Sequence, residues 1–144
     1  IPGHRMKMDR DHVVPLSTQA VQILKELQNM TGHCDYLFPS VRSAHKPISD
    51  VTLLKLIQIL GYKGDSRITP HGFRHTASTI LNEKRYNSDV IERQLAHVEK
   101  NKVRGTYNHA EYLNERRIMM QDYADHLDQL KQDYEISSEG KTHE

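Results

Sequence analysis

The chain has 144 residues, of which 36% are hydrophobic and 27% charged. This length and composition fit one domain with a buried core and exclude a disordered chain. The net charge is only +1 with histidine neutral, so charge alone does not indicate a nucleic-acid-binding protein. The single cysteine, Cys34, excludes an internal disulfide framework, and we expect neither a membrane span nor a signal peptide.

The first half of the chain predicts one short β-hairpin and two helices. Apolar residues within residues 4–8 and 11–16 flank a polar turn, which is typical of a hairpin. Ser17 is a suitable N-cap for an amphipathic helix that ends near Gly32. A second amphipathic helix is expected within residues 49–61, because apolar residues there recur at helical spacing and a glycine follows them.

The second half of the chain predicts three more helices. A Thr-Pro pair is typical of the N-cap and first residue of a helix, here over residues 69–83. A shorter helix, capped by a serine, is expected over residues 88–95, and a long one over residues 109–131. Residues 132–144 are polar and acidic, and we expect a mobile tail there. These elements predict a mainly α fold with a small N-terminal antiparallel β-hairpin, residues 1–131 forming one domain.

A group of residues suited to phosphoryl transfer begins in the first turn of the helix over residues 69–83. His71 and Arg74 are one helical turn apart, on the face where the helix amide groups also favour an anion. Arg74 can hold a phosphate diester with its planar fork, and His71 and His97 can donate hydrogen bonds to the oxygens. Tyr107 offers a hydroxyl nucleophile. Phosphoryl transfer to a protein side chain needs this combination.

The order and spacing of these residues resemble the catalytic domain of the tyrosine site-specific recombinases, the phage-integrase family. That family carries a His-x-x-Arg motif, then a Leu-Gly-His-like motif, then the nucleophilic tyrosine a short way downstream. Here the second motif is Leu95-Ala96-His97, and Tyr107 follows it at a matching distance. The segment before residue 17 is similar to integrases of genomic islands and satellite phages.

The resemblance implies a role for each of these side chains. Arg74 would be the second of two arginines that clamp the scissile phosphate, and His71 the first catalytic histidine. His97 would occupy the position of a catalytic histidine or tryptophan. Tyr107 would attack a DNA phosphodiester and form a 3′-phosphotyrosyl link, without metal, ATP or another cofactor. Lys7 lies where the family carries a hairpin lysine that protonates the leaving 5′ oxygen.

A local cluster of basic residues predicts the surface that contacts DNA phosphates. Its members are Lys84, Arg93, Lys100, Lys102 and Arg104. The resemblance implies double-stranded DNA at attachment sites as the main partner, with other integrase protomers and accessory DNA-bending proteins as further partners. It implies no membrane partner, and a location in the bacterial cytoplasm, on the nucleoid.

Simpler interpretations of single residues compete with this one. Taken alone, His71 and Arg74 would be two solvated residues on a helix turn. Tyr112 lies on an apolar stripe and is expected in the core, and Tyr86 precedes the Leu-Ala-His motif. His71 and His75 have the spacing of a zinc-binding pair, but a third ligand is lacking and Arg74 lies between them. We therefore expect His75 to pack against or orient a neighbour.

The predicted function is DNA integration and site-specific recombination. The alternatives are a metal-free nuclease or type IB topoisomerase-like enzyme, and a non-catalytic DNA-binding prophage remnant. The start at Ile1-Pro2-Gly3 indicates a piece of a longer protein. In the family the first clamp arginine lies upstream, in a Thr-Gly-x-Arg-like motif that this sequence does not contain. Residues 1–144 alone are therefore expected to be inactive.

Overall fold

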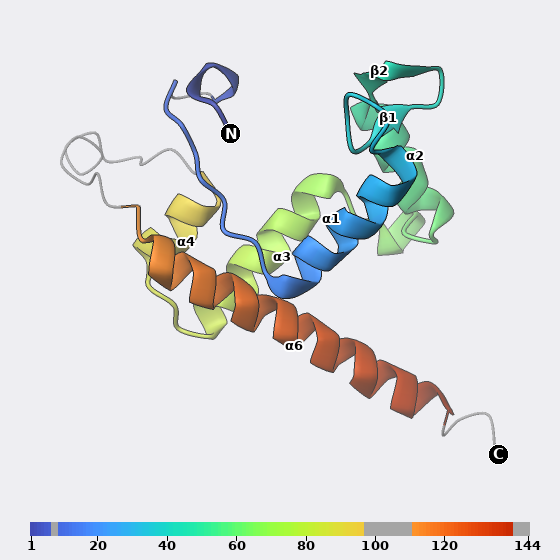
Figure 1. Ribbon diagram of the computed structural model, residues 1–144. Helices are drawn as coiled ribbons and strands as arrows, with labels where there is room; N and C mark the ends of the chain where they lie inside the picture. Colours follow the sequence, from blue (N-terminus) through green and yellow to red (C-terminus); the bar gives the residue numbers. More distant parts are fainter. Residues whose placement is uncertain (7–8, 97–110, 140–144) are drawn as a thin grey trace. The chain divides into compact units, whose positions relative to one another are not determined.

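The computed structural model describes residues 1–6, 9–96 and 111–139, and the described part is mainly helical with one small antiparallel sheet (Figure 1). This confirms the predicted fold class. In chain order the elements are η1 (Gly3–Arg5), α1 (Thr18–Thr31), β1 (Pro39–Ser40), β2 (Ser43–Pro47), α2 (Asp50–Ile59), η2 (Gly64–Ser66), α3 (Pro70–Glu83), α4 (Ser88–Gln94) and α6 (Leu113–Glu139). They group into two compact units, one formed by Ile1–Thr18 with Leu81–Glu144 and the other by Gln19–Ile80.

The sheet lies in the second unit and not at the N-terminus, where the hairpin was predicted. Strands β1 and β2 pair antiparallel, with Ser40 opposite Ser43. Among the described residues before Ser17, residues 3–5 form a short 3-10 helix and no strand is present. Ile1 and His12 do exchange two backbone hydrogen bonds, of 2.8 and 2.9 Å. That single pairing does not extend into a ladder, because residues 3–5 form a 3-10 helix instead of an extended strand.

Helices α1 and α2 begin and end close to the predicted residues. Helix α1 starts directly after Ser17. Helix α2 is capped by Ser49, whose Oγ accepts a hydrogen bond from the Thr52 N–H at 3.2 Å. The chain leaves α2 through Gly61 at φ 101°, a conformation that a residue with a Cβ rarely adopts. The predicted apolar faces are less buried than expected, since α1 has no buried residue and Ile57 is the buried residue of α2.

Two details of the later helices differ from the prediction. The N-cap of α4 is Asn87 and not Ser88, because the Asn87 side chain accepts a hydrogen bond from the Asp89 N–H at 2.9 Å. Helix α6 continues past residue 131 to Glu139, so residues 132–139 are helical. The predicted division into a domain and a mobile tail at residue 131 stays a prediction. No helix in the described ranges is long and apolar enough to span a bilayer.

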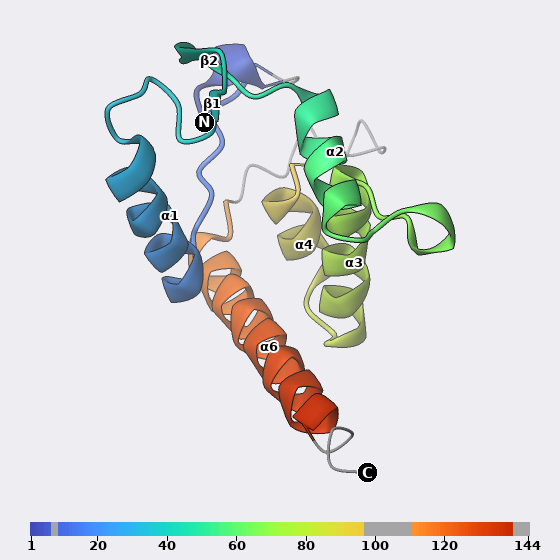
Figure 2. The same ribbon diagram turned by 90° about the vertical axis from the view of Figure 1, so that its right-hand side faces the viewer.

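The core of the first unit lies where the end of α3, helix α4 and the first half of α6 meet. Its fully buried members are Leu81, Ile91 and Met119, with Val90 beside them. Tyrosines, Leu95 and Met120 pack around this cluster. Figures 1 and 2 both show α4 beside the first turns of α6, while the later turns of α6 extend beyond it. The predicted apolar stripe of α6 is accordingly buried at Met119 but exposed farther along the helix.

Removing a side chain from this core should destabilise the first unit strongly. Ile91→Ala is expected to lower the free energy of unfolding by about 3 kcal/mol, because Ile91 is 0% exposed and its loss leaves a cavity. Ile136→Ala is the matched control, since Ile136 lies on α6 and is 71% exposed. Urea denaturation followed by circular dichroism measures both variants. Equal losses in the two would contradict the described core.

Candidate active site

The first turn of α3 presents His71 and Arg74 from a well-capped helix start. Thr69 caps the helix, because its Oγ1 and its carbonyl oxygen both accept from the Gly72 N–H, at 3.1 and 2.9 Å. Pro70 suits the first helical position, since it has no N–H that would need a partner. The predicted start of α3 is thereby confirmed. Residues three apart share one face, so His71 and Arg74 project from the same side of the helix; His71 is exposed and Arg74 half-buried.

His75 contacts His71 one turn farther along α3. The two ring centroids are 4.6 Å apart with an interplanar angle of 88°, an edge-to-face arrangement. This contact fits the expectation that His75 packs against or orients a neighbour. Within the part of the chain that the structure describes, no three His, Cys, Asp or Glu side chains gather as a metal site would require.

The remaining predicted catalytic residues, His97, Tyr107 and Lys7, lie outside the described residues, as do Lys100, Lys102 and Arg104. The structure therefore places His71 and Arg74 alone among the predicted catalytic side chains. The assembly of the full set around one phosphate stays a prediction.

Three other tyrosines are partly buried and pack against the core of the first unit. Tyr112 and Tyr123 pack against the buried cluster, and burial raises the pKa of the Tyr123 hydroxyl. The Tyr86 hydroxyl donates to Asp122 at 3.0 Å. Burial first, and then this hydrogen bond, raise the pKa of Tyr86. A raised pKa disfavours the phenolate, so Tyr86 and Tyr123 are poorly suited to act as a nucleophile. Tyr112 packs against the core, as expected of it.

The two described members of the predicted DNA-contact set both have protein partners. Lys84 Nζ lies 2.9 Å from the carboxylate of Asp122, and its hydrogen bond is the largest cause of a lowered Asp122 pKa. Arg93 forms an ion pair with Glu111. Lys84 thus connects the turn after α3 to helix α6. Arg93 connects α4 to the residue Glu111, just before α6. A contact with DNA phosphate would have to share or replace these partners.

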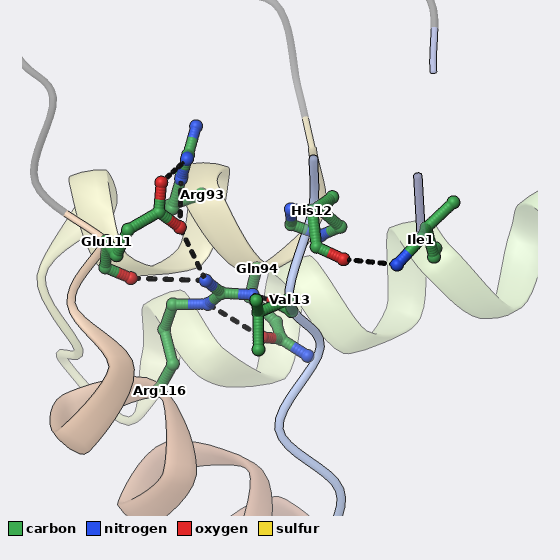
Figure 3. Close-up of polar contacts among 7 residues, drawn as sticks. All are labelled: Ile1, His12, Val13, Arg93, Gln94, Glu111 and Arg116. Atoms are coloured by element: carbon green, nitrogen blue, oxygen red, sulfur yellow. Dashed lines mark hydrogen bonds and ion pairs between the residues drawn. The ribbon is translucent and has the colours of Figure 1, made fainter. Parts of the chain in front are cut away.

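A buried arginine that the sequence analysis did not single out lies beside Arg93. Arg116, on α6, is 0% exposed, and Figure 3 shows its guanidinium between three separate segments. Its Nε donates to Gln94 Oε1 at 2.9 Å, its Nη1 to the Glu111 carbonyl at 3.1 Å, and its Nη2 to the Val13 carbonyl. Burial, and then the charge of Arg93, lower the pKa of Arg116. The sequence signal was its place on the apolar stripe of α6.

His12 is buried next to this arginine and should be neutral in the folded chain. It is 5% exposed, and burial is the largest cause of its lowered pKa. The positive charges of Arg116, Arg93 and the amino terminus lower the pKa further, while a hydrogen bond to the backbone of Gln94 raises it. All three of these charged neighbours are cations, and they disfavour a further positive charge on the His12 ring.

The lowered pKa of His12 predicts a loss of stability on acidification. The unfolded chain takes up a proton near the ordinary value of 6.5, whereas the folded chain does so only at lower pH. This contribution is therefore complete above pH 6.5 and declines as pH falls below it, by at most about 1.4 kcal/mol per pH unit. Denaturant titrations between pH 5 and 8 should show the decline, and His12→Gln should flatten it. His33→Gln, at an exposed histidine, is the control and should keep it.

The second residue of the Leu-Ala-His motif, Ala96, is left-handed. Helix α4 ends at Gln94 with Leu95 as its C-cap, and Ala96 follows with φ 49°. A left-handed residue at this position is a common helix ending and is usually glycine, because a Cβ there costs about 1 kcal/mol. Ala96 occupies the position of the glycine in the Leu-Gly-His-like motif of the tyrosine recombinases. The geometry thus gives a physical reason for the family's preference, and alanine here retains the same turn.

A mainly helical chain that presents histidine and arginine from one helix start, followed in sequence by histidine and tyrosine, has the pattern of a tyrosine recombinase catalytic domain. The family model described as "Phage integrase family" matches residues 1–114. The chain belongs to the phage integrase family, and the predicted resemblance is confirmed.

Curated relatives agree with this assignment. The chain is 50% identical over 131 residues to prophage integrase IntZ of Escherichia coli K12, covering 90% of this chain and 32% of the relative. It is 45% identical over 125 residues to prophage integrase IntA of the same organism, covering 87% and 30%. Against the integrase of Enterobacteria phage P4 it is 42% identical over 131 residues, covering 90% and 30%. The chain therefore spans about a third of these relatives' length. No solved structure matches it.

Proposed function

We propose that this chain is the catalytic part of an enzyme that cleaves and rejoins DNA at specific sites, with Tyr107 as the nucleophile. The observation that supports this most is the joint presentation of His71 and Arg74 from the first turn of α3, in a chain that the integrase family model matches over residues 1–114. The partners proposed with this function are attachment-site DNA, other protomers on that DNA and DNA-bending proteins, in the bacterial cytoplasm.

The proposed reaction is an exchange of one ester for another at phosphorus. The Tyr107 oxygen attacks the scissile phosphate, its bond to phosphorus forms, and the bond from phosphorus to the 5′ oxygen breaks. The tyrosine proton leaves to a base, and the departing 5′ oxygen takes a proton, which we assign to Lys7. The ester bond is conserved in the 3′-phosphotyrosyl link. A 5′ hydroxyl of a partner strand can therefore reverse the step without nucleotide hydrolysis.

The protein's contribution to this step is orientation and charge. In the transition state, negative charge grows on the non-bridging oxygens of the phosphate. Arg74 can meet two of these oxygens with its planar fork, while His71 and His97 donate single hydrogen bonds. Preorganised donors of this kind supply most of the catalysis in phosphoryl transfer. The edge-to-face contact with His75 supports this proposal, since it gives the His71 ring a neighbour against which to orient.

The test is whether the enzyme becomes covalently attached to DNA. A duplex nicked near the cleavage site traps the intermediate, because the short leaving strand diffuses away and cannot religate. A chain of the relatives' full length that carries this sequence should form a protease-sensitive adduct at a DNA 3′ end. Absence of any adduct would favour a water-activating nuclease or a DNA-binding remnant. An adduct without strand exchange between two duplexes would favour the topoisomerase-like alternative.

The same assay applies to residues 1–144 alone. We propose that they form little adduct, since by resemblance one of the two clamp arginines comes from upstream chain. Adduct formation at the full-length rate would show that this sequence supplies every catalytic group itself.

A further inference from the structure

The guanidinium of Arg116 connects three segments of the first unit that are distant in sequence. It donates to Val13 in the N-terminal segment, to Gln94 at the end of α4, and to Glu111 just before α6 (Figure 3). A guanidinium is planar and its N–H groups point in set directions, so groups bound to it are held in a set arrangement. Arg116 itself is fully buried on α6. The contact therefore fixes these segments relative to the helix.

Two of these partners flank the segment that carries the proposed nucleophile. Gln94 precedes residues 97–110 in the sequence and Glu111 follows them directly. The Glu111 carboxylate forms a second connection between the same ends, because it pairs with Arg93 of α4 and lies 3.7 Å from Arg116 Nη1. Side chains thus join the last turn of α4 to Glu111 in two ways, through Arg93 and through Arg116.

The backbone at both flanks is held in an uncommon conformation. Ala96 has φ 49° and Tyr112 has φ 48°, values that residues with a Cβ adopt only when their surroundings hold them there. The Tyr112 carbonyl accepts from the Arg116 N–H at 2.8 Å. The contacts of Arg116 supply part of the support that such a conformation needs.

We infer that Arg116 is a positioning residue for strand cleavage. It sets the distance between Gln94 and Glu111, and so the placement of His97 and Tyr107, which lie between these two residues in the sequence. This inference rests on the proposed function. Arg116 does not touch the reacting atoms in this scheme and acts through the two ends it holds. A shift of about 1 Å in a reacting group can cost a hundredfold in rate, so even a small change in the contacts of Arg116 would slow cleavage.

Arg116→Met allows folding and positioning to be separated. Methionine is close to arginine in volume, and Glu111 keeps its ion pair with Arg93, so the exchange leaves no buried charge unpaired. The variant would keep α4 packed on α6 but would lose all three directed hydrogen bonds. Arg116→Lys keeps the charge without the planar fork. Arg117→Met is the matched control, since Arg117 is the neighbouring residue on α6 and is exposed.

The experiment is single-turnover adduct formation on a nicked duplex, with enzyme in excess, in a chain of the relatives' full length. The amplitude reports the folded, DNA-binding fraction and the rate constant reports the placement of the nucleophile. We expect Arg116→Met to lower the rate constant at saturating enzyme by at least about tenfold, with amplitude and DNA affinity retained. Arg116→Lys should be slowed as well, and Arg117→Met should match the parent.

The outcomes distinguish this inference from the proposed function. A parental rate constant in Arg116→Met overturns the inference, and so does a lowered amplitude with an unchanged rate constant, since folding alone would then be affected. If Arg116→Met does not fold, Gln94→Met removes the hydrogen bond between Arg116 and α4 instead. Its amplitude and rate constant are then judged in the same way. Tyr107→Phe is run alongside: an undiminished adduct there overturns the proposed function itself, whatever the Arg116 variants do.

Discussion

Tyr107→Phe is expected to abolish covalent attachment of the enzyme to nicked attachment-site DNA while leaving DNA binding nearly unchanged. Phenylalanine has no hydroxyl, so the phosphotyrosyl ester cannot form, and loss of a nucleophile typically costs on the order of a millionfold in rate. Adduct formation is measured on a denaturing gel and affinity by a filter or gel-shift assay. The variant should bind with parental affinity and yield no band.

Tyr112→Phe is the matched control for this experiment. Tyr112 packs against the buried cluster of the first unit, and Phe keeps its ring there. This variant should form the adduct normally. If Tyr112→Phe lost the adduct while Tyr107→Phe kept it, the nucleophile would have been assigned to the wrong tyrosine. Adduct loss in both would point to a shared effect on folding, which circular dichroism would reveal.

Arg74→Lys is expected to slow adduct formation by about a hundredfold to a thousandfold, the usual effect of removing one preorganised donor to a developing oxyanion. Lysine keeps the positive charge, but its ammonium group cannot meet two phosphate oxygens at once. The expected loss is therefore in the rate constant for cleavage at saturating enzyme, with a smaller change in DNA affinity. Single-turnover kinetics at several enzyme concentrations separate the two quantities.

Arg42→Lys is the control for the charge-preserving exchange, because Arg42 is exposed between β1 and β2 and has no assigned role. It should leave the cleavage rate unchanged. A parental rate in Arg74→Lys would mean that charge alone is needed at this position. The bidentate clamp, and with it the assigned role of Arg74, would then be wrong.

Much of the helical structure was predictable because the signals that start and end helices are local. The Thr-Pro pair at the start of α3 and Gly61 after α2 act on backbone groups within one turn of themselves. The family was predictable for a similar reason, since its motifs have an order and spacing that can be read along the chain. His71 and Arg74 required only a helix to bring them together. The roles of the residues outside the described ranges stay predictions.

The features that the sequence analysis placed wrongly or missed depend on contacts between distant residues. The predicted N-terminal hairpin is absent from the described residues, where residues 3–5 form a 3-10 helix and the Val13 carbonyl accepts from Arg116, 103 residues away. Arg116 lies on the same stripe as Met119, so periodicity marks its face of α6 as the inner one. Periodicity cannot show that an arginine on that face stays buried. A buried charge requires partners, and Gln94 and Glu111 come within reach of its guanidinium only once α4 has packed on α6.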